Sequence, residues 1–189
     1  MKKKMIEWVD RVEGTIEALP EEMEYLLQND LKSPEGLTII DFKTALSQAV
    51  VERCDKETEE LIADGHAILD EPVRYLKENP EHFVYLEAEC FDRVGVDGIS
   101  LEMNDVFHTY GALLGLKLQK KFGPEIKEIL GETLANGEDS YELLFNGEDG
   151  LWDLNLTLND MRGFSEEATL LEMYEMVYQF IFFLRFTIE

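Results

Sequence analysis

The chain contains little cysteine, with Cys54 and Cys90 the only two in 189 residues. They form no CxxC motif and lack the spacing of a metal site, so neither a disulfide framework nor a zinc-binding module is expected. Sparse, unpaired cysteine is typical of proteins whose thiols stay reduced. We therefore predict two reduced thiols near the core and a cytoplasmic location.

Basic residues are also few, since 17 Lys and Arg stand against 41 Asp and Glu, for a net charge of −24. Nucleic acids and anionic membrane surfaces both attract clustered Lys and Arg. Neither is therefore expected as a partner. The acidity is concentrated toward the C-terminus, where residues 128–189 contain 14 acidic residues and only two basic ones, Arg162 and Arg185.

Sequence motifs of common enzymes are missing as well. There is no Walker-type loop and no GxGxxG, GxSxG or HExxH pattern. The basic start, MKKKMIEWVDRVEG, is followed at once by charged residues where a signal peptide would have an apolar run. We therefore expect a protein that is not an enzyme, uses no cofactor and carries no signal peptide.

What the sequence does contain is a strongly apolar final segment, Ser165 to Glu189. Its apolar residues form two rows at helical spacing, which cover more than one face: Tyr174, Tyr178 and Phe182 in one row, and Val177, Ile181, Leu184 and Ile188 in the other. A helix that is apolar nearly all round is normally buried. Glu175, Gln179 and Arg185 interrupt the segment, so it is too short for a membrane span. The pattern predicts a central core helix.

Apolar residues at helical spacing also run through most of the chain before this segment. The pattern predicts helices at about 3–19, from Pro20, at about 41–63, from Pro80 to about Arg93, from Ser100 to about Lys121, and from Pro124 to about Ala135. A short strand at Leu37–Ile40 is an alternative within this series. We predict a single all-α domain spanning 1–189, a multi-helix bundle packed around the buried C-terminal helix.

The segment 136–164 allows two interpretations. Leu151, Leu154, Leu158 and Met161 fit one face of a helix, and this interpretation agrees with the all-α fold. However, Trp152, Leu154, Leu156 and Leu158 also alternate with polar residues, and Asn-Gly pairs favour hairpin turns. The alternative is therefore an α+β fold with a small hairpin near 141–158.

The same region supplies the first candidate site. Acidic residues stand among aromatic ones there, a combination that suits contact with a basic protein surface. The candidate residues are Glu138, Asp139, Glu142, Glu148, Asp149, Trp152 and Asp153. Acidic groups steer the approach of a basic partner, and aromatic rings supply contact area. The competing interpretation is a solvated acidic face above core aromatic residues.

These observations lead to a functional hypothesis. We expect a non-catalytic, acidic protein of the immunity or inhibitor kind, which binds and regulates a protein partner through that partner's basic surface. A homodimer that uses surplus apolar surface of residues 165–189 is compatible with this function.

A second candidate site consists of four acids in two pairs. Glu57 and Glu60, and Glu89 and Asp92, are each three residues apart, which places each pair on one face of a predicted helix. This arrangement resembles the paired-acid helices of the MazG-like nucleoside triphosphate pyrophosphohydrolases, which are all-α. The resemblance covers these four residues and their helical setting. It implies, as the alternative function, an Mg²⁺-dependent nucleotide hydrolase in which these acids bind the metal.

Overall fold

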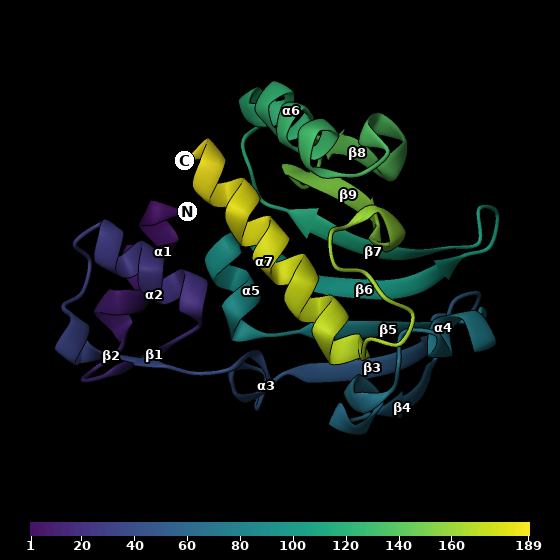
Figure 1. The fold of residues 1–189 in the computed structure, drawn as a ribbon, viewed down its shortest axis with the longest axis horizontal. Coiled ribbons are helices and arrows are strands. Elements are labelled where there is room, and N and C mark those ends of the chain that lie inside the picture. The colour runs from purple at the N-terminus through teal and green to yellow at the C-terminus, as the bar shows by residue number, and fades with distance from the viewer.

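The computed structural model describes all residues, 1–189, and shows an α+β fold (Figure 1). The prediction of an all-α helical bundle was therefore wrong. The fold is built on a seven-stranded antiparallel sheet with the order β4-β3-β5-β6-β7-β9-β8, so that β4 and β8 form its edges. The strands are β3 (Val50–Asp55), β4 (Leu61–Asp64), β5 (His82–Glu87), β6 (Val96–Asn104), β7 (Thr109–Leu116), β8 (Tyr141–Asn146) and β9 (Leu151–Thr157).

Strand β7 shows why the predicted helix from Ser100 to Lys121 is instead a β-hairpin. Its fully buried residues recur at every second position, at Tyr110, Ala112, Leu114 and Leu116. A period of two is the period of a strand, in which successive side chains point to opposite faces. Leu113 falls between two of the buried residues, so the alternation was hidden in an apolar run.

The segment 141–158 forms the hairpin that the alternative interpretation proposed. Strands β8 and β9 pair from Tyr141 opposite Leu156 to Asn146 opposite Leu151. The predicted helices at 41–63 and from Pro80 to Arg93 were wrong over most of their length, because those segments contain β3, β4 and β5.

Helices surround this sheet, mainly at one end and over one face. They are α1 (Lys2–Arg11), α2 (Pro20–Gln28), α3 (Phe42–Ala45), α4 (Tyr75–Glu78), α5 (Glu89–Val94), α6 (Gly123–Thr133) and α7 (Leu170–Ile188). A separate parallel strand pair accompanies the first two helices: β1 (Ile16–Ala18) lies between α1 and α2 in the chain, and β2 (Leu37–Ile39) lies between α2 and α3. Short 3₁₀ helices are η1 (Pro34–Gly36), η2 (His66–Asp70), η3 (Lys120–Phe122), η4 (Gly137–Ser140) and η5 (Leu158–Asp160).

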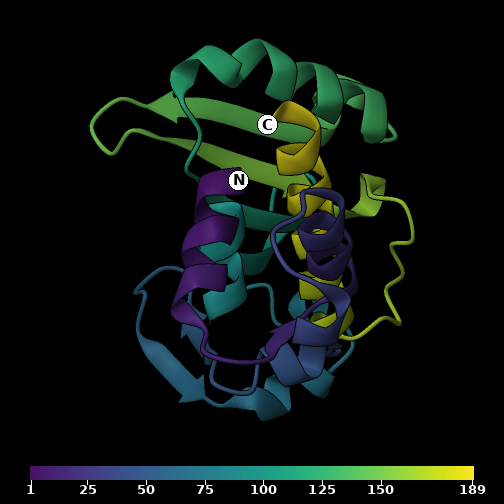
Figure 2. The ribbon, with the colours of Figure 1, turned by 90° about the vertical axis from the view of Figure 1, so that its left-hand side faces the viewer.

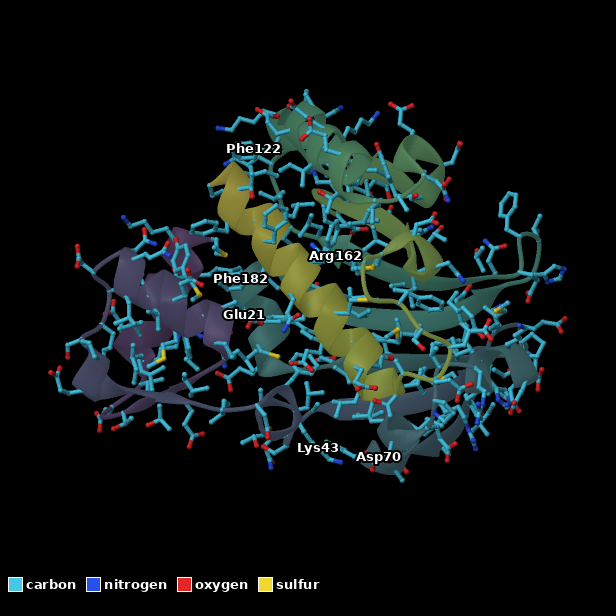
Figure 3. All side chains as sticks on the ribbon, viewed as in Figure 1. Glu21, Lys43, Asp70, Phe122, Arg162 and Phe182 are labelled. Carbon is cyan, nitrogen blue, oxygen red and sulfur yellow. The ribbon has the colours of Figure 1, made fainter.

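Helix α7 is the buried C-terminal helix that the sequence predicted, and it crosses the face of the sheet seen in Figure 1. Thr169 caps its N-terminus by accepting a hydrogen bond from the Glu172 backbone N–H, and the Glu172 carboxylate bonds back to Thr169. Helix α2 packs beside α7 (Figure 2). The Tyr25 ring makes an edge contact with the Phe182 ring, with 6.1 Å between the ring centres. An ion pair between Lys43 and Asp70, 2.7 Å long, joins α3 to η2 (Figure 3).

A buried ion pair connects the N-terminal helices to the rest of the core. Glu22 on α2 is 0% exposed, and both its carboxylate oxygens accept hydrogen bonds from Arg93 of α5 at 2.7 Å. The Tyr178 hydroxyl of α7 donates to the same carboxylate at 2.6 Å, and the Leu19 backbone N–H donates at 2.9 Å. The Arg93 guanidinium in turn lies 4.0 Å from the centre of the Trp8 ring. One carboxylate thus links α1, α2, α5 and α7.

The apolar core forms a single cluster of 47 buried residues, which includes residues of both sheets and of α1, α2, α5, α6 and α7. Cys54 and Cys90 are both free thiols and buried. None of the helices combines the length and the apolar character that crossing a bilayer requires.

Candidate functional site

The face of the large sheet opposite α7, here called the open face, is not covered by any other element. Strand register assigns side chains to it: Tyr85 lies opposite Glu52 on one neighbouring strand and opposite Ser100 on the other, and the row continues through Leu113 and Asn155. All of these residues keep partial exposure, whereas their neighbours on the α7 side are buried. The open face is therefore a solvent-facing surface.

Carboxylates dominate the charge of the open face. They come from six of the seven strands, and they are Glu52, Asp64, Glu87, Glu102, Glu142 and Asp153. Arg53 is the only Lys or Arg within the seven strands, and it pairs with buried Val84 on the α7 side of the sheet. The open face thus carries acidic groups from the strands and no basic group from them.

The pKa values of two open-face residues reflect this environment. Burial, and then the nearby carboxylates of Glu87, Asp97 and Glu52, raise the pKa of Tyr85. Burial also raises the pKa of Glu102, although Lys56 opposes the effect. Carboxylates from three different strands, β3, β5 and β6, thus lie near one tyrosine hydroxyl.

Apolar side chains occupy the middle of the open face. Phe83, Tyr85 and Leu113 are all partly exposed there. Gly98 makes room for the Tyr85 ring to lie flat on the sheet, because a Cβ at this position would lie 2.5 Å from the ring. Two further apolar residues of this face, Val50 and Leu144, are exposed nearer its edges, opposite Glu87 and Asp153. An apolar centre in mainly acidic surroundings suits a protein-binding surface, in which the centre is desolvated.

The predicted partner-binding residues are divided between three locations. Glu142 and Asp153 belong to the open face, where the Asn155 amide donates to Glu142 at 3.3 Å. Glu138 and Asp139 lie in η4, before β8, and Glu148 and Asp149 lie in the turn after β8. These four residues flank the two ends of the edge strand.

Trp152 belongs to the core rather than to the surface. Its side chain is only 7% exposed, and its ring centre lies 5.0 Å from that of Phe145. A Cβ at Gly123 would lie 2.7 Å from the Trp152 ring, so α6 packs directly on the indole. Trp152 is therefore not available for contact with a partner.

The structure does not bring the four predicted metal ligands together. Glu57 and Glu60 lie in the turn between β3 and β4, beyond Asp55, whereas Glu89 and Asp92 lie on α5, beyond Glu87. Strands β3 and β5 are antiparallel, and their register places Asp55 and Glu87 at opposite ends of the pair. Because a strand rises about 3.3 Å per residue, the two acid pairs are separated by roughly 17 Å of sheet.

The resemblance to the MazG-like enzymes rested on paired acids on facing helices, and that setting is not formed. Asp92 instead forms an ion pair with Lys4 of α1 at 2.8 Å, which lowers its pKa. No cluster of three or more His, Cys, Asp or Glu side chains has a metal-binding arrangement.

The surface also has two small pockets. One, of about 240 Å³, lies between α1 and α5 and is lined by Lys4, Glu7, Trp8, Arg11, Val12, Glu89, Asp92 and Arg93. The other, of about 250 Å³, lies at the β4 edge beside Arg53 and Glu71. Both are below the usual size of a ligand pocket, about 300–1,000 Å³, and both mix acidic and basic groups.

Sequence reasoning missed Glu52, Glu87 and Glu102, which lie far apart in the chain and come to share one face only through strand pairing. No local pattern marks them: in β5, burial alternates between Val84 and Leu86 and their neighbours, but Phe83 to Leu86 is an unbroken run of apolar and aromatic residues. No protein family, curated protein or solved structure matches this chain.

Proposed function

We propose that this protein is a non-catalytic binding protein of the inhibitor or immunity kind, which docks its open face on a basic surface of a protein partner. The observation that carries the proposal is the charge of that face: six strand carboxylates surround Phe83, Tyr85 and Leu113, and the strands contribute no Lys or Arg to it. Acidic groups accelerate and orient the approach of a basic partner, and the apolar centre supplies the contact that excludes water.

The size of the open face supports the same proposal. Seven strands spaced by about 4.8 Å, each about six residues long at about 3.3 Å per residue, cover roughly 29 Å by 20 Å. This is roughly 600 Å² before side-chain relief is added, whereas a stable interface takes about 800 Å² from each partner. The face is therefore large enough to form most of a specific interface.

A charge-reversal experiment with a matched control tests this function. The open-face variant combines Glu87→Lys, Glu142→Lys and Asp153→Lys, which replace three exposed residues that form no ion pair. The control variant combines Glu125→Lys, Glu128→Lys and Glu132→Lys, three exposed acids of α6. Both variants change the net charge equally. Wild type and both variants are immobilised and exposed to lysate of the source cell at low and high salt.

A partner that wild type and control capture at low salt, and that the open-face variant loses, is the expected result. Each exposed ion pair contributes about 0.2–1 kcal/mol, so three reversals should weaken the measured affinity by about tenfold or more. Equal losses in the two variants would show that only net charge matters, and would contradict a docking role for this face. Melting temperatures of all three proteins confirm that the variants are folded.

A further inference from the structure

The turn between β6 and β7, here called the hairpin tip, exposes two apolar side chains. Val106 is 78% exposed and Phe107 is 75% exposed, the highest values among the large hydrophobic residues of the chain. The tip extends beyond the ends of the neighbouring strands (Figure 1). Nothing in the fold contacts these two side chains closely enough to bury them, so the core does not explain their identity.

Hydrogen bonds hold the hairpin tip in one conformation. The Asn104 side-chain oxygen accepts hydrogen bonds from the backbone N–H groups of Val106 and Phe107, both at 3.0 Å. The His108 N–H donates to the Asn104 carbonyl at 2.8 Å, and His108 has a left-handed φ of 54°. An aromatic residue held in place before binding loses less entropy when it binds, which increases affinity.

Lys56, in the turn between β3 and β4, holds that turn against the base of the β6–β7 hairpin. The Lys56 ammonium donates to the Met103 carbonyl at 2.6 Å and to the Asp105 carboxylate at 3.2 Å, and it lies 3.9 Å from Glu102. Two carboxylates therefore offset one ammonium. Glu57, in the same turn as Lys56, is exposed and adds negative charge.

We propose that Phe107, together with Val106, is an anchor that inserts into an apolar pocket rimmed by Lys or Arg on the partner protein. The proposal rests on the proposed function, because the hairpin tip continues the open face from Glu102 and Gly111. Aromatic anchors that fill pockets supply most of the affinity in many interfaces. The acidic surround favours a basic pocket rim, and it disfavours both an anionic membrane and a second copy of this acidic chain.

The test uses a displayed library of disulfide-closed random peptides, selected on the immobilised full chain at physiological salt. Affinities of the selected peptides are then measured for wild type, Phe107→Ala and Phe183→Ala. Phe183 is 48% exposed on α7 and serves as the matched control for loss of an exposed phenyl ring. A fourth variant, Asn104→Ala, keeps the phenyl ring but removes the two hydrogen bonds that fix the turn.

The proposal expects selected peptides that combine Lys or Arg with apolar residues. Their affinity should fall by about tenfold or more with Phe107→Ala, by a smaller factor with Asn104→Ala, and not at all with Phe183→Ala. Melting temperatures should stay unchanged for Phe107→Ala, because the side chain is exposed.

Three results would overturn the anchor. The first is that Phe107→Ala binds the peptides as well as wild type does, while the open-face variant no longer binds them. This result would contradict the anchor but still support docking through the open face. The second is that no peptide is enriched, or that the enriched peptides lack basic residues. The third is binding to vesicles of zwitterionic lipid that Phe107→Ala abolishes, which would make the tip a membrane contact. Conversely, peptide binding that is lost in Phe107→Ala but unchanged in the open-face variant would support the anchor and contradict the proposed function.

Discussion

The Glu22–Arg93 pair gives the sharpest prediction about stability. Glu22 is completely buried, and it receives hydrogen bonds from Arg93, Tyr178 and the Leu19 backbone. Replacement by alanine would leave the Arg93 charge buried without its carboxylate, and the Tyr178 hydroxyl without an acceptor. Removal of one partner from a buried pair costs about 3–5 kcal/mol. Because domains of this kind are stable by about 5–15 kcal/mol, Glu22→Ala should lose about a fifth of the total or more.

A double-mutant cycle separates the ion pair from simple loss of volume. Glu22→Leu combined with Arg93→Met replaces both charges by apolar groups of similar size, which removes the penalty of an unpaired buried charge. The only cost that remains is the loss of the acceptor for the Tyr178 hydroxyl and the Leu19 N–H. The double variant should therefore be far more stable than Glu22→Ala or Glu22→Leu alone. Urea unfolding, followed by circular dichroism, measures the free energies, and fluorescence of Trp8, which stacks on Arg93, reports the site itself. Strictly additive effects, or a loss below about 1 kcal/mol for Glu22→Ala, would refute the reasoning.

Three further predictions follow from burial. Burial raises the pKa of the Cys90 thiol to about 12. A thiol reagent at pH 8 should therefore label Cys90 only as fast as the protein unfolds. Immediate labelling would contradict the position of Cys90 in the core. Burial, and then the charges of Glu22 and Glu175, raise the pKa of Glu21, which lies beside α7 (Figure 3). The folded state therefore disfavours the Glu21 carboxylate above that pKa, and the penalty disappears as pH falls through it. Glu21→Gln should thus increase the free energy of unfolding at pH 7 but not at pH 4, and an equal effect at both pH values would exclude this cause. Trp152→Ala should lower the free energy of unfolding by about 3–5 kcal/mol in the same assay, because it leaves a cavity between β9 and α6. An unchanged free energy of unfolding would contradict the placement of Trp152 in the core.

The parts of the fold that were predictable are those in which one local signal decides the structure. Helix α7 is apolar on more than one face, and burial is the only stable arrangement for it. Pro20 starts α2, and Asp41 caps α3 by accepting from the Thr44 N–H at 2.7 Å. These signals depend on residues within a few positions of one another, so a single sequence contains them.

The large sheet was not predictable in the same way, because the open face carries apolar residues of its own. Leu113 and Phe83 stand beside buried neighbours, so strands that alternate in burial do not alternate in hydropathy. For the same reason the candidate site was only partly found. Glu142 and Asp153 share one hairpin and were identified, whereas Glu52, Glu87 and Glu102 join them only when strands distant in sequence pair.

The two edges of the sheet give the acidity a second consequence. An edge strand presents unpaired backbone groups, and a second chain can add its own strand there and begin an aggregate. Carboxylates lie at both edges: Glu57, Glu59, Glu60 and Asp64 are at or beside β4, and Glu138, Asp139, Glu142, Glu148 and Asp149 are at or beside β8. Two copies that approached edge to edge would therefore repel each other at neutral pH. Because salt screens exposed charges, high ionic strength is the condition that weakens this protection.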